Sequence, residues 1–184
     1  LVGVVNADIG LNIPDFRSGE KTFQLLYQAS GRAGRSQKPG EVIIQSSSPD
    51  NLAIQHASML EVKKYYKLML KEREELNYPP YSWLSKIEMV GKSKSYLSSI
   101  AQRFKDNIIG RYEGLEVLGP APCYYEKIRN QYRYQFILKS SKSFDPNSKK
   151  LHKFVEINFL NQKGFKINYN KCKVNIHRDP LNLN

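Results

Sequence analysis

The chain has 184 residues, of which 40% are hydrophobic, and a formal net charge of +12 at pH 7. No apolar run approaches the ~20 residues that a membrane-spanning helix needs, so we expect a cytoplasmic protein without membrane contact. Two cysteines, Cys123 and Cys172, are too few for a disulfide framework or a cysteine-based zinc site.

Residues 1–50 are predicted to form the strands and helix of one side of an α/β sheet. Residues 1–5 and 41–45 are short apolar segments that favour buried strands. Residues 20–30 have helical spacing, with Phe23, Leu26 and Tyr27 on one face. The glycine-rich residues 31–40 are predicted to form a loop. Because two short strands cannot form an independent core, this sheet is incomplete within the chain. The chain also lacks an initiating Met, so we expect it to begin inside a longer protein.

Residues 51–80 are predicted to form a helical linker. Ser48 or Asp50 is a suitable N-terminal cap, and apolar residues then follow at helical spacing over residues 51–76. Pro79 and Pro80 end any helix, because proline lacks a backbone donor and disfavours helix in the preceding residue. We therefore expect a domain boundary at this diproline.

Residues 81–184 are predicted to form a small α+β domain of the split-βαβ type. Strands are expected over residues 83–90, 115–118, 123–128, 132–138 and 173–176, and helices over residues 95–109 and 149–161. The order β-α-β-β-α-β places two helices on one face of a small sheet. The strands at 123–128 and 132–138 flank Arg129, Asn130 and Gln131 as a hairpin.

The net positive charge of the chain comes entirely from residues 51–184. Residues 1–50 contain five basic and five acidic side chains, whereas residues 51–184 contain 24 basic and 12 acidic ones. Such an excess indicates a polyanionic partner, most often nucleic acid. A lysine-rich composition without any such contact is the alternative interpretation.

A segment after the first predicted helix contains candidate phosphate-binding residues, namely Gln28, Gly31, Arg32, Gly34 and Arg35. Glycine lets the backbone approach a phosphate closely, and arginine offers a rigid, permanently charged fork that fits phosphate oxygens. An inserted arginine also stabilises the charge that spreads over a transferring phosphoryl group. A basic turn that contacts nothing is the structural alternative.

The full pattern Q-x-x-G-R-x-G-R resembles motif VI of superfamily 2 helicases. Other segments are similar to the PriA family of primosomal replication-restart DNA helicases. These segments are D-F-R-S-x-E at residues 15–20, N-Y-P-P-Y at 77–81, V-L-G-P at 117–120, Y-R-Y-Q at 132–135 and D-P at 179–180. The similarity covers nearly the whole chain and is strongest over residues 15–45.

This resemblance implies the C-terminal portion of an ATP-dependent 3′–5′ DNA helicase that recognises stalled replication forks and restarts replication by primosome assembly. Arg32 and Arg35 would contact the γ-phosphate of ATP beside Gly31 and Gly34, with Arg35 as the arginine finger and Gln28 assisting. The implied partners are forked or single-stranded DNA, the single-stranded DNA-binding protein and other primosome proteins. Residues 1–50 would end the second RecA-like helicase lobe, residues 51–80 would be the linker, and residues 81–184 would form the basic C-terminal domain.

Two further pairs of residues come from the region before the arginine motif. Asp8 and Gly10 lie near the position of helicase motif V, where the resemblance implies coupling between ATP and DNA. Asp15 and Arg17 are expected to form a structural ion pair that orders their loop.

Several parts of a helicase are absent from this sequence. It contains no G-x-x-x-x-G-K-S/T phosphate loop and no Asp-Glu magnesium motif. We therefore expect ATP and Mg²⁺ to be bound mainly by an upstream part of the protein, and this chain alone to be inactive. The zinc module of the family is likewise expected only upstream, because no histidine or cysteine here has ligand spacing.

The later part of the chain interleaves aromatic and basic side chains. Lys127, Arg129 and Arg133 are candidate DNA-binding residues, because cations hold phosphates while nearby aromatics stack on bases. Alternate strand residues also face a core, and we expect Phe136 to do so. The competing hypothesis for the whole chain is a non-enzymatic nucleic-acid-binding α/β module, which would not require the arginine motif.

Overall fold

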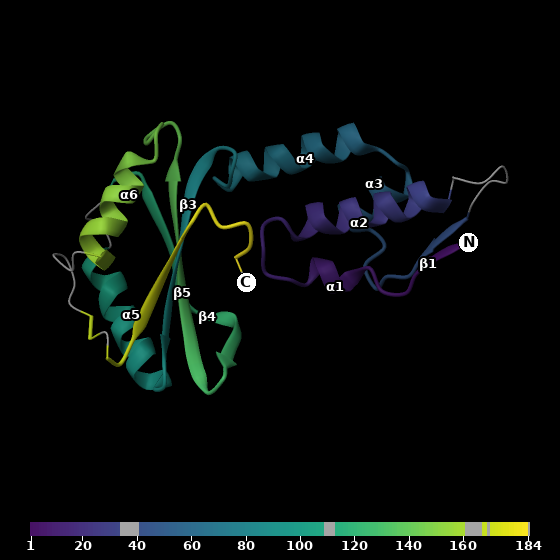
Figure 1. Ribbon diagram of the computed structural model, residues 1–184. Coiled ribbons are helices and arrows are strands. Elements are labelled where there is room, and N and C mark those ends of the chain that lie inside the picture. Colours follow the sequence, from purple (N-terminus) through teal and green to yellow (C-terminus); the bar gives the residue numbers. More distant parts are fainter. Residues whose placement is uncertain (34–40, 109–112, 161–166, 169, 184) are drawn as a thin grey trace. The chain divides into compact units, whose positions relative to one another are not determined.

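The computed structural model describes residues 1–33, 41–108, 113–160, 167–168 and 170–183 (Figure 1). The chain has a mixed α/β fold that divides into two compact units, Leu1–Glu72 and Arg73–Asn184. The boundaries predicted at residues 50 and 80 lie on either side of this division. No helix among the described residues is long and apolar enough to span a membrane.

The first unit contains a parallel pair of strands and a group of helices. Its elements are β1 (Val2–Val4), α1 (Asp8–Leu11), α2 (Ser18–Ala33), β2 (Val42–Ile44), α3 (Leu52–Ser58) and most of α4 (Val62–Glu75). Strands β1 and β2 pair in parallel, with Gly3 opposite Ile43. Parallel pairing requires a crossover, and α1 and α2 lie in that connection.

The core of the first unit forms around the apolar face of α2. Phe23 and Leu26 are buried one helical turn apart, which is the spacing predicted from the sequence. The Phe23 ring stacks on the Tyr65 ring, with 4.2 Å between centroids and 10° between planes. This contact fixes α4 against α2, because an aromatic pair adds about 0.5–1.5 kcal/mol beyond its buried area.

The predicted single helix over residues 51–76 is wrong, because the chain forms α3 and α4 with a break between them. At the break, Leu60 has a φ of 57° and its amide donates to the Ala57 carbonyl, while the Glu61 amide donates to the His56 carbonyl. This is a Schellman ending, which satisfies the last carbonyls of a helix. The predicted cap also differs, since Asn51 accepts the Ala53 amide at 2.9 Å.

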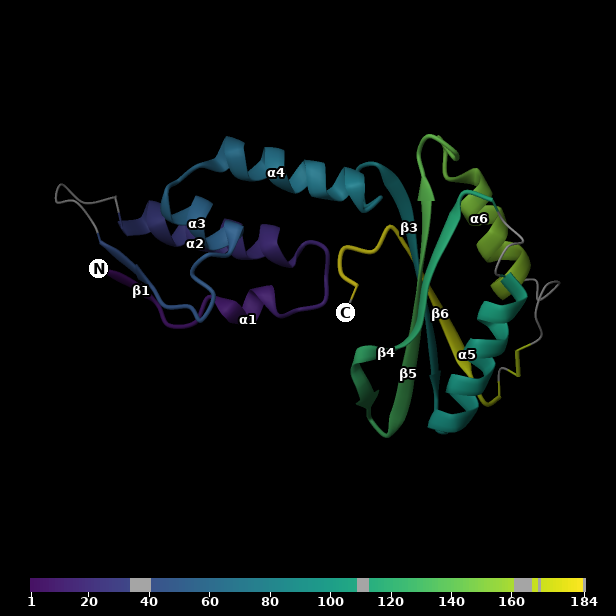
Figure 2. The same cartoon turned by 180° about the vertical axis from the view of Figure 1, so that it is seen from behind.

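The second unit has the predicted β-α-β-β-α-β order (Figure 2). Its elements are β3 (Ser82–Gly91), α5 (Lys94–Ile108), β4 (Leu115–Ile128), β5 (Gln131–Ser141), α6 (Lys149–Val155) and β6 (Lys173–Arg178). A π-helical segment, Glu156–Leu160, continues α6. The strands form one antiparallel sheet in the order β4-β5-β3-β6.

Helices α5 and α6 cover one face of this sheet, and the hydrophobic core lies beneath them (Figure 1). Phe104 of α5 packs between Phe136 of the sheet and Phe159, with ring centroids 5.2 and 4.3 Å away. Phe136 is fully buried and Tyr134 nearly so, which confirms the expectation that this side of β5 faces the core.

Strand β4 is a single strand, whereas the sequence predicted two separate strands in this region. It runs without interruption from Leu115 to Ile128, with register shifts between Leu118 and Ala121 and between Pro122 and Lys127. Gly119 has a φ of +103°, and an added Cβ would lie 2.7 Å from the Gln135 carbonyl oxygen. Glycine therefore lets β4 bulge while it stays close to β5.

The opposite face of the sheet is polar and partly covered by the C-terminal segment. Lys86 and Glu88 of β3 are buried there, on the side away from α5 and α6. The Lys86 ammonium donates to the Leu183 carbonyl at 3.0 Å. Asp179 exchanges hydrogen bonds with the Leu84 backbone, its amide donating at 2.9 Å and its carboxylate accepting at 3.2 Å. The C-terminal segment is thus fixed on this face of the sheet.

Candidate functional site

Three residues of the arginine motif lie at the exposed C-terminal end of α2. Gln28, Gly31 and Arg32 are all exposed, and their i, i+3, i+4 spacing places them on one side of the helix. The predicted loop from residue 31 is wrong at its start, because α2 continues to Ala33. Gly34 and Arg35 lie outside the described residues.

Gly31 lies within α2 and not in the predicted loop. Its relevant property is therefore the absence of a side chain, and not a loop conformation. An added Cβ at Gly31 would meet no atom of the described residues within 4 Å. Gln28 and Arg32 lie one helical turn apart on this exposed side of α2, so an anion could approach both side chains. This arrangement can donate hydrogen bonds to phosphate oxygens and supply one positive charge.

Asp8 connects α1 to the segment that follows β2. Its carboxylate accepts hydrogen bonds from the Ser46 hydroxyl at 2.6 Å, the Ser47 amide at 2.7 Å and the Ser47 hydroxyl at 3.0 Å. The Ser46 and Ser47 hydrogen bonds hold the pKa of Asp8 below its ordinary value of 3.8. These contacts give Asp8 a structural role in orienting the end of β2.

Gly10 permits close packing between α1 and α2. A Cβ at this position would lie 2.4 Å from the Thr22 hydroxyl oxygen. The two residues singled out near motif V, Asp8 and Gly10, therefore each have a packing or hydrogen-bonding role in the first unit.

Asp15 contacts two residues of the loop before α2 and the start of that helix, including an ion pair with Lys21. The buried Asp15 carboxylate lies 3.1 Å from the Lys21 ammonium and accepts the Arg17 backbone amide at 2.9 Å. The Arg17 guanidinium lies 4.7 Å from the centroid of the Phe16 ring. Asp15 therefore orders this loop through the Lys21 ammonium and the Arg17 backbone amide.

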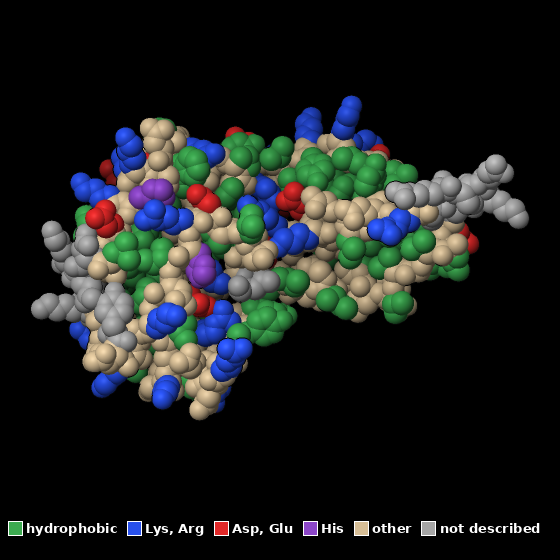
Figure 3. Space-filling model, in the orientation of Figure 1, with side chains coloured by type: hydrophobic (Ala, Val, Ile, Leu, Met, Phe, Trp, Pro, Cys, Tyr) green, Lys and Arg blue, Asp and Glu red, His purple; other side chains and the backbone are tan. Residues whose placement is uncertain are grey.

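The hairpin between β4 and β5 presents two of the three candidate DNA-binding cations. Arg129 and Asn130 have φ values of 48° and 61°, which is the pattern of a two-residue type I′ turn. Lys127 and Arg129 are exposed, and the Lys127 ammonium lies 4.9 Å from the centroid of the Tyr132 ring. Figure 3 shows Lys and Arg side chains scattered over the visible face of the molecule.

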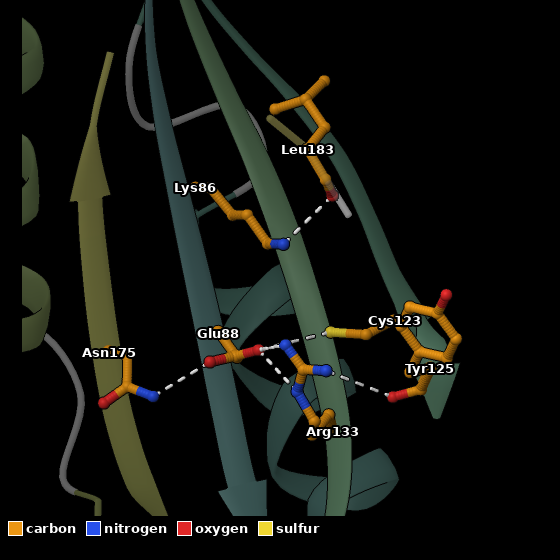
Figure 4. Close-up of polar contacts among 7 residues, drawn as sticks. All are labelled: Lys86, Glu88, Cys123, Tyr125, Arg133, Asn175 and Leu183. Carbon is orange, nitrogen blue, oxygen red and sulfur yellow. Dashed lines mark hydrogen bonds and ion pairs between the residues drawn. The ribbon is translucent and has the colours of Figure 1, made fainter. Parts of the chain in front are cut away.

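Arg133 has a different environment from the other two cations. Its side chain is 18% exposed and forms an ion pair with Glu88, with the Nε atom 2.7 Å from the carboxylate (Figure 4). The guanidinium also donates to the Tyr125 carbonyl at 3.4 Å. Because this charge is already paired, Arg133 offers less to a phosphate than Lys127 or Arg129 does.

Glu88 lies at the centre of a polar cluster that sequence reasoning missed. Besides Arg133, its carboxylate accepts the Asn175 amide at 2.9 Å and lies 3.8 Å from the Cys123 sulfur (Figure 4). Burial alone would raise the pKa of Glu88, but the Asn175 and Arg133 hydrogen bonds and nearby cations outweigh it and lower the pKa. Burial is also the main reason that the pKa of Cys123 rises to about 11, so this thiol is protonated at neutral pH.

The signal for this cluster was present in the alternation of β3. Lys86 and Glu88 occupy the positions between the core-facing Ile87 and Met89, which indicates a polar second face. Their burial could not be predicted, because it depends on contacts with residues 35 to 97 positions away.

The described residues form neither a metal site nor a complete nucleotide site. No cluster of three or more His, Cys, Asp or Glu side chains suitable for a metal occurs among residues 1–33, 41–108, 113–160, 167–168 and 170–183. For ATP, the donors of Gln28 and Arg32 fit phosphate oxygens. They would supply only part of a nucleotide site.

The family model and the similar proteins all indicate the same family for this chain. Residues 74–181 match the family described as "Primosomal protein N C-terminal domain". The chain is 43% identical over 143 residues to a Bacillus subtilis (strain 168) protein named replication restart protein PriA, which covers 76% of the chain and 17% of that protein.

Two further relatives carry the same name. The Chlamydia pneumoniae protein is 39% identical over 83% of the chain and 20% of its own length. The Rickettsia prowazekii protein is 33% identical over 98% of the chain and 26% of its own length. The chain thus spans 17–26% of the length of these three relatives.

Proposed function

The chain belongs to the PriA family of replication restart proteins, and we propose that it serves as the C-terminal portion of an ATP-dependent 3′–5′ DNA helicase. This helicase recognises stalled replication forks and restarts replication by primosome assembly. Residues 1–50 contribute the end of its second RecA-like lobe. The parallel pair of β1 and β2, with α1 and α2 in the connection, is compatible with such a lobe.

The observation that carries this proposal is the placement of Gln28 and Arg32 on one exposed side of α2, where an added Cβ at Gly31 would meet no atom of the described residues within 4 Å. In the proposed motor, Arg32 and Arg35 contact the γ-phosphate, with Arg35 as the arginine finger. Charge develops on the phosphoryl group during hydrolysis, so a cation placed there lowers the barrier. ATP and Mg²⁺ are held mainly by the upstream lobe, which also carries the zinc module.

The second unit supplies DNA contacts in this proposal. Lys127 and Arg129 are exposed at the β4–β5 hairpin and hold backbone phosphates of forked or single-stranded DNA. Arg133 positions this hairpin through its hydrogen bond to the Tyr125 carbonyl. The single-stranded DNA-binding protein and other primosome proteins are the further partners, and the site of action is the cytoplasm.

The test is the ATPase rate of the full-length protein, measured with and without forked DNA. We expect Arg35→Ala, and to a lesser degree Arg32→Ala, to lower the fork-stimulated rate, because each removes charge at the γ-phosphate. The expected loss for the arginine finger is about 10³-fold. ATP binding should persist in both variants, because the upstream lobe provides most of the nucleotide contacts.

Lys63→Ala is the matched control, since Lys63 is an exposed cation of the first unit on α4. It should leave the stimulated rate within about twofold, as expected for a surface substitution. A wild-type protein without DNA-stimulated hydrolysis would contradict the helicase proposal. The non-enzymatic nucleic-acid-binding module would then be the better account.

A further inference from the structure

A pocket of about 480 Å³ opens at one end of the second unit. It lies where β3 ends, α5 begins and the chain enters β6, and the first residue of β5 also lines it (Figures 1 and 2). This volume is within the range of about 300–1,000 Å³ that is typical of ligand sites.

The fold builds this pocket through close contact at Gly91. An added Cβ there would lie 2.6 Å from the Lys171 carbonyl oxygen and 3.3 Å from the Leu97 side chain. The Lys171 amide donates to the Asn168 carbonyl at 3.0 Å, which forms the turn that leads into β6. Val90 is paired with Lys173 in the sheet register, so the lysines of this turn are held beside the end of β3.

The charge of the pocket is uniformly positive. Lys92, Lys171 and Lys173 line it, and none of the described lining residues is acidic. All three lysines are exposed, and the structure shows no ion pair for them within its described part. Lys94, two residues beyond Lys92, differs because its ammonium is paired with Glu126. Among the described residues, no acidic side chain neutralises the pocket lysines, so they can pair with an anionic ligand.

The other lining residues of the pocket provide groups that can contact the base and sugar of a nucleotide. Tyr96 provides an aromatic side, with the Lys171 ammonium 5.8 Å from the centroid of its ring. Gln131 and Ser93 contribute amide and hydroxyl groups. Gln131 directly follows the Arg129–Asn130 turn, so the pocket adjoins the exposed hairpin cations.

We propose that this pocket binds a backbone phosphate of single-stranded DNA through Lys92, Lys171 and Lys173, with Tyr96 beside the adjoining base. The proposal rests on the proposed DNA-binding role of the chain and gives that role a specific site. Single strands are favoured over duplex because their unstacked bases can contact an aromatic side chain. Free inorganic phosphate or a mononucleotide shares the phosphate chemistry but lacks the contacts of neighbouring nucleotides.

The experiment measures binding of the chain to a labelled oligothymidylate by fluorescence anisotropy over a range of salt concentrations. The pocket variant combines Lys92→Ala, Lys171→Ala and Lys173→Ala. The control variant combines Lys63→Ala, Lys67→Ala and Lys149→Ala, which removes the same charge from exposed positions outside the pocket. Circular dichroism confirms that both variants are folded.

The pocket variant should bind about tenfold more weakly than the control variant, because it loses phosphate contacts as well as net charge. Its plot of log affinity against log salt should also flatten, by about 0.7 for each lost phosphate contact. Thymidine monophosphate and inorganic phosphate, added as competitors, should displace the oligonucleotide only weakly.

Equal affinities for the two variants would overturn the pocket site while leaving DNA binding by the chain intact. Displacement by thymidine monophosphate as effective as that by unlabelled oligonucleotide would also overturn it, since the ligand would then be a free nucleotide. A wild-type chain that does not bind the oligonucleotide at all would contradict the DNA-binding role itself, and the pocket proposal with it.

Discussion

At the scale of single residues, Glu88 shows how the second unit keeps charge inside a small sheet. Its side chain is 8% exposed, yet it is ionised because Arg133, Asn175 and Lys86 surround it. Removing a carboxylate from such a cluster leaves the Arg133 guanidinium without its ion-pair partner. An unsatisfied group of this kind costs about 1–3 kcal/mol.

The lowered pKa of Glu88 predicts a pH-dependent contribution to stability. The folded pKa lies below the ordinary 4.5, so this contribution is present above pH 4.5 and is lost as the pH falls through the folded pKa. Glu88→Gln should therefore lower the free energy of unfolding by about 1–3 kcal/mol at neutral pH. The difference from the wild type should shrink on acidification, as measured by urea unfolding.

Glu116→Gln is the control for this prediction. Glu116 is 44% exposed and pairs with Lys139, which also donates to the Leu76 carbonyl and so keeps a partner. The substitution should change stability by less than about 1 kcal/mol at any pH. If the effect of Glu88→Gln were instead constant between neutral and acidic pH, the pKa of Glu88 would not be lowered.

The candidate cations also differ at the residue scale. Arg129 and Arg133 both lie among aromatic residues in the sequence, and local sequence does not distinguish their roles. The structure leaves Arg129 exposed on a turn and pairs Arg133 with a carboxylate 45 positions earlier in the chain. Sequence reasoning identifies cations, but their long-range partners decide which of them are available.

At the scale of secondary-structure elements, periodicity predicted the existence of most helices and strands but not their breaks. Helix α5 follows its predicted spacing because Leu97 and Phe104 face one core. The break between α3 and α4 has neither glycine nor proline, and Leu60 adopts a positive φ there. Packing of Tyr65 on Phe23 favours this geometry, and such a tertiary contact is not visible in local sequence.

Strand β4 shows the opposite kind of wrong prediction. Residues that usually end a strand lie within it, yet the strand continues. Pro120, Pro122 and Gly119 normally indicate a turn, and we predicted one. The strand continues through a register shift in which Gly119 and Pro120 lie between the paired residues Leu118 and Ala121, whereas Pro122 is paired with Tyr134. Gly119 therefore forms a bulge that stays close to β5, and not the turn that we predicted.

Gly119→Ala tests this account of the bulge. The φ of +103° is unfavourable for alanine, and the new Cβ would lie 2.7 Å from the Gln135 carbonyl oxygen. The variant should lose about 1–3 kcal/mol of stability, with faster amide hydrogen exchange in β4 and β5. Gly3→Ala is the control, since its Cβ would meet nothing within 4 Å, and it should have little effect on this unit. Equal exchange in both variants would contradict a strained bulge.

At the scale of the whole molecule, the two units contribute different things to the proposed function. The first has Gln28, Gly31 and Arg32 at an exposed helix end, and the second has a sheet with exposed cations at its hairpin and pocket. The order of elements in the second unit was predictable because each has a regular apolar pattern. The fixed position of the C-terminal segment was not, since it depends on hydrogen bonds from β3.

The most direct test of the central claim is strand separation by the full-length protein on labelled forked DNA in the presence of ATP. We expect ATP-dependent unwinding of a fork with a 3′ single-stranded arm for translocation, and much slower unwinding of one with only a 5′ arm. Arg35→Ala should abolish the unwinding while fork binding remains. Binding of forks without ATP-dependent unwinding of either substrate would contradict the helicase account.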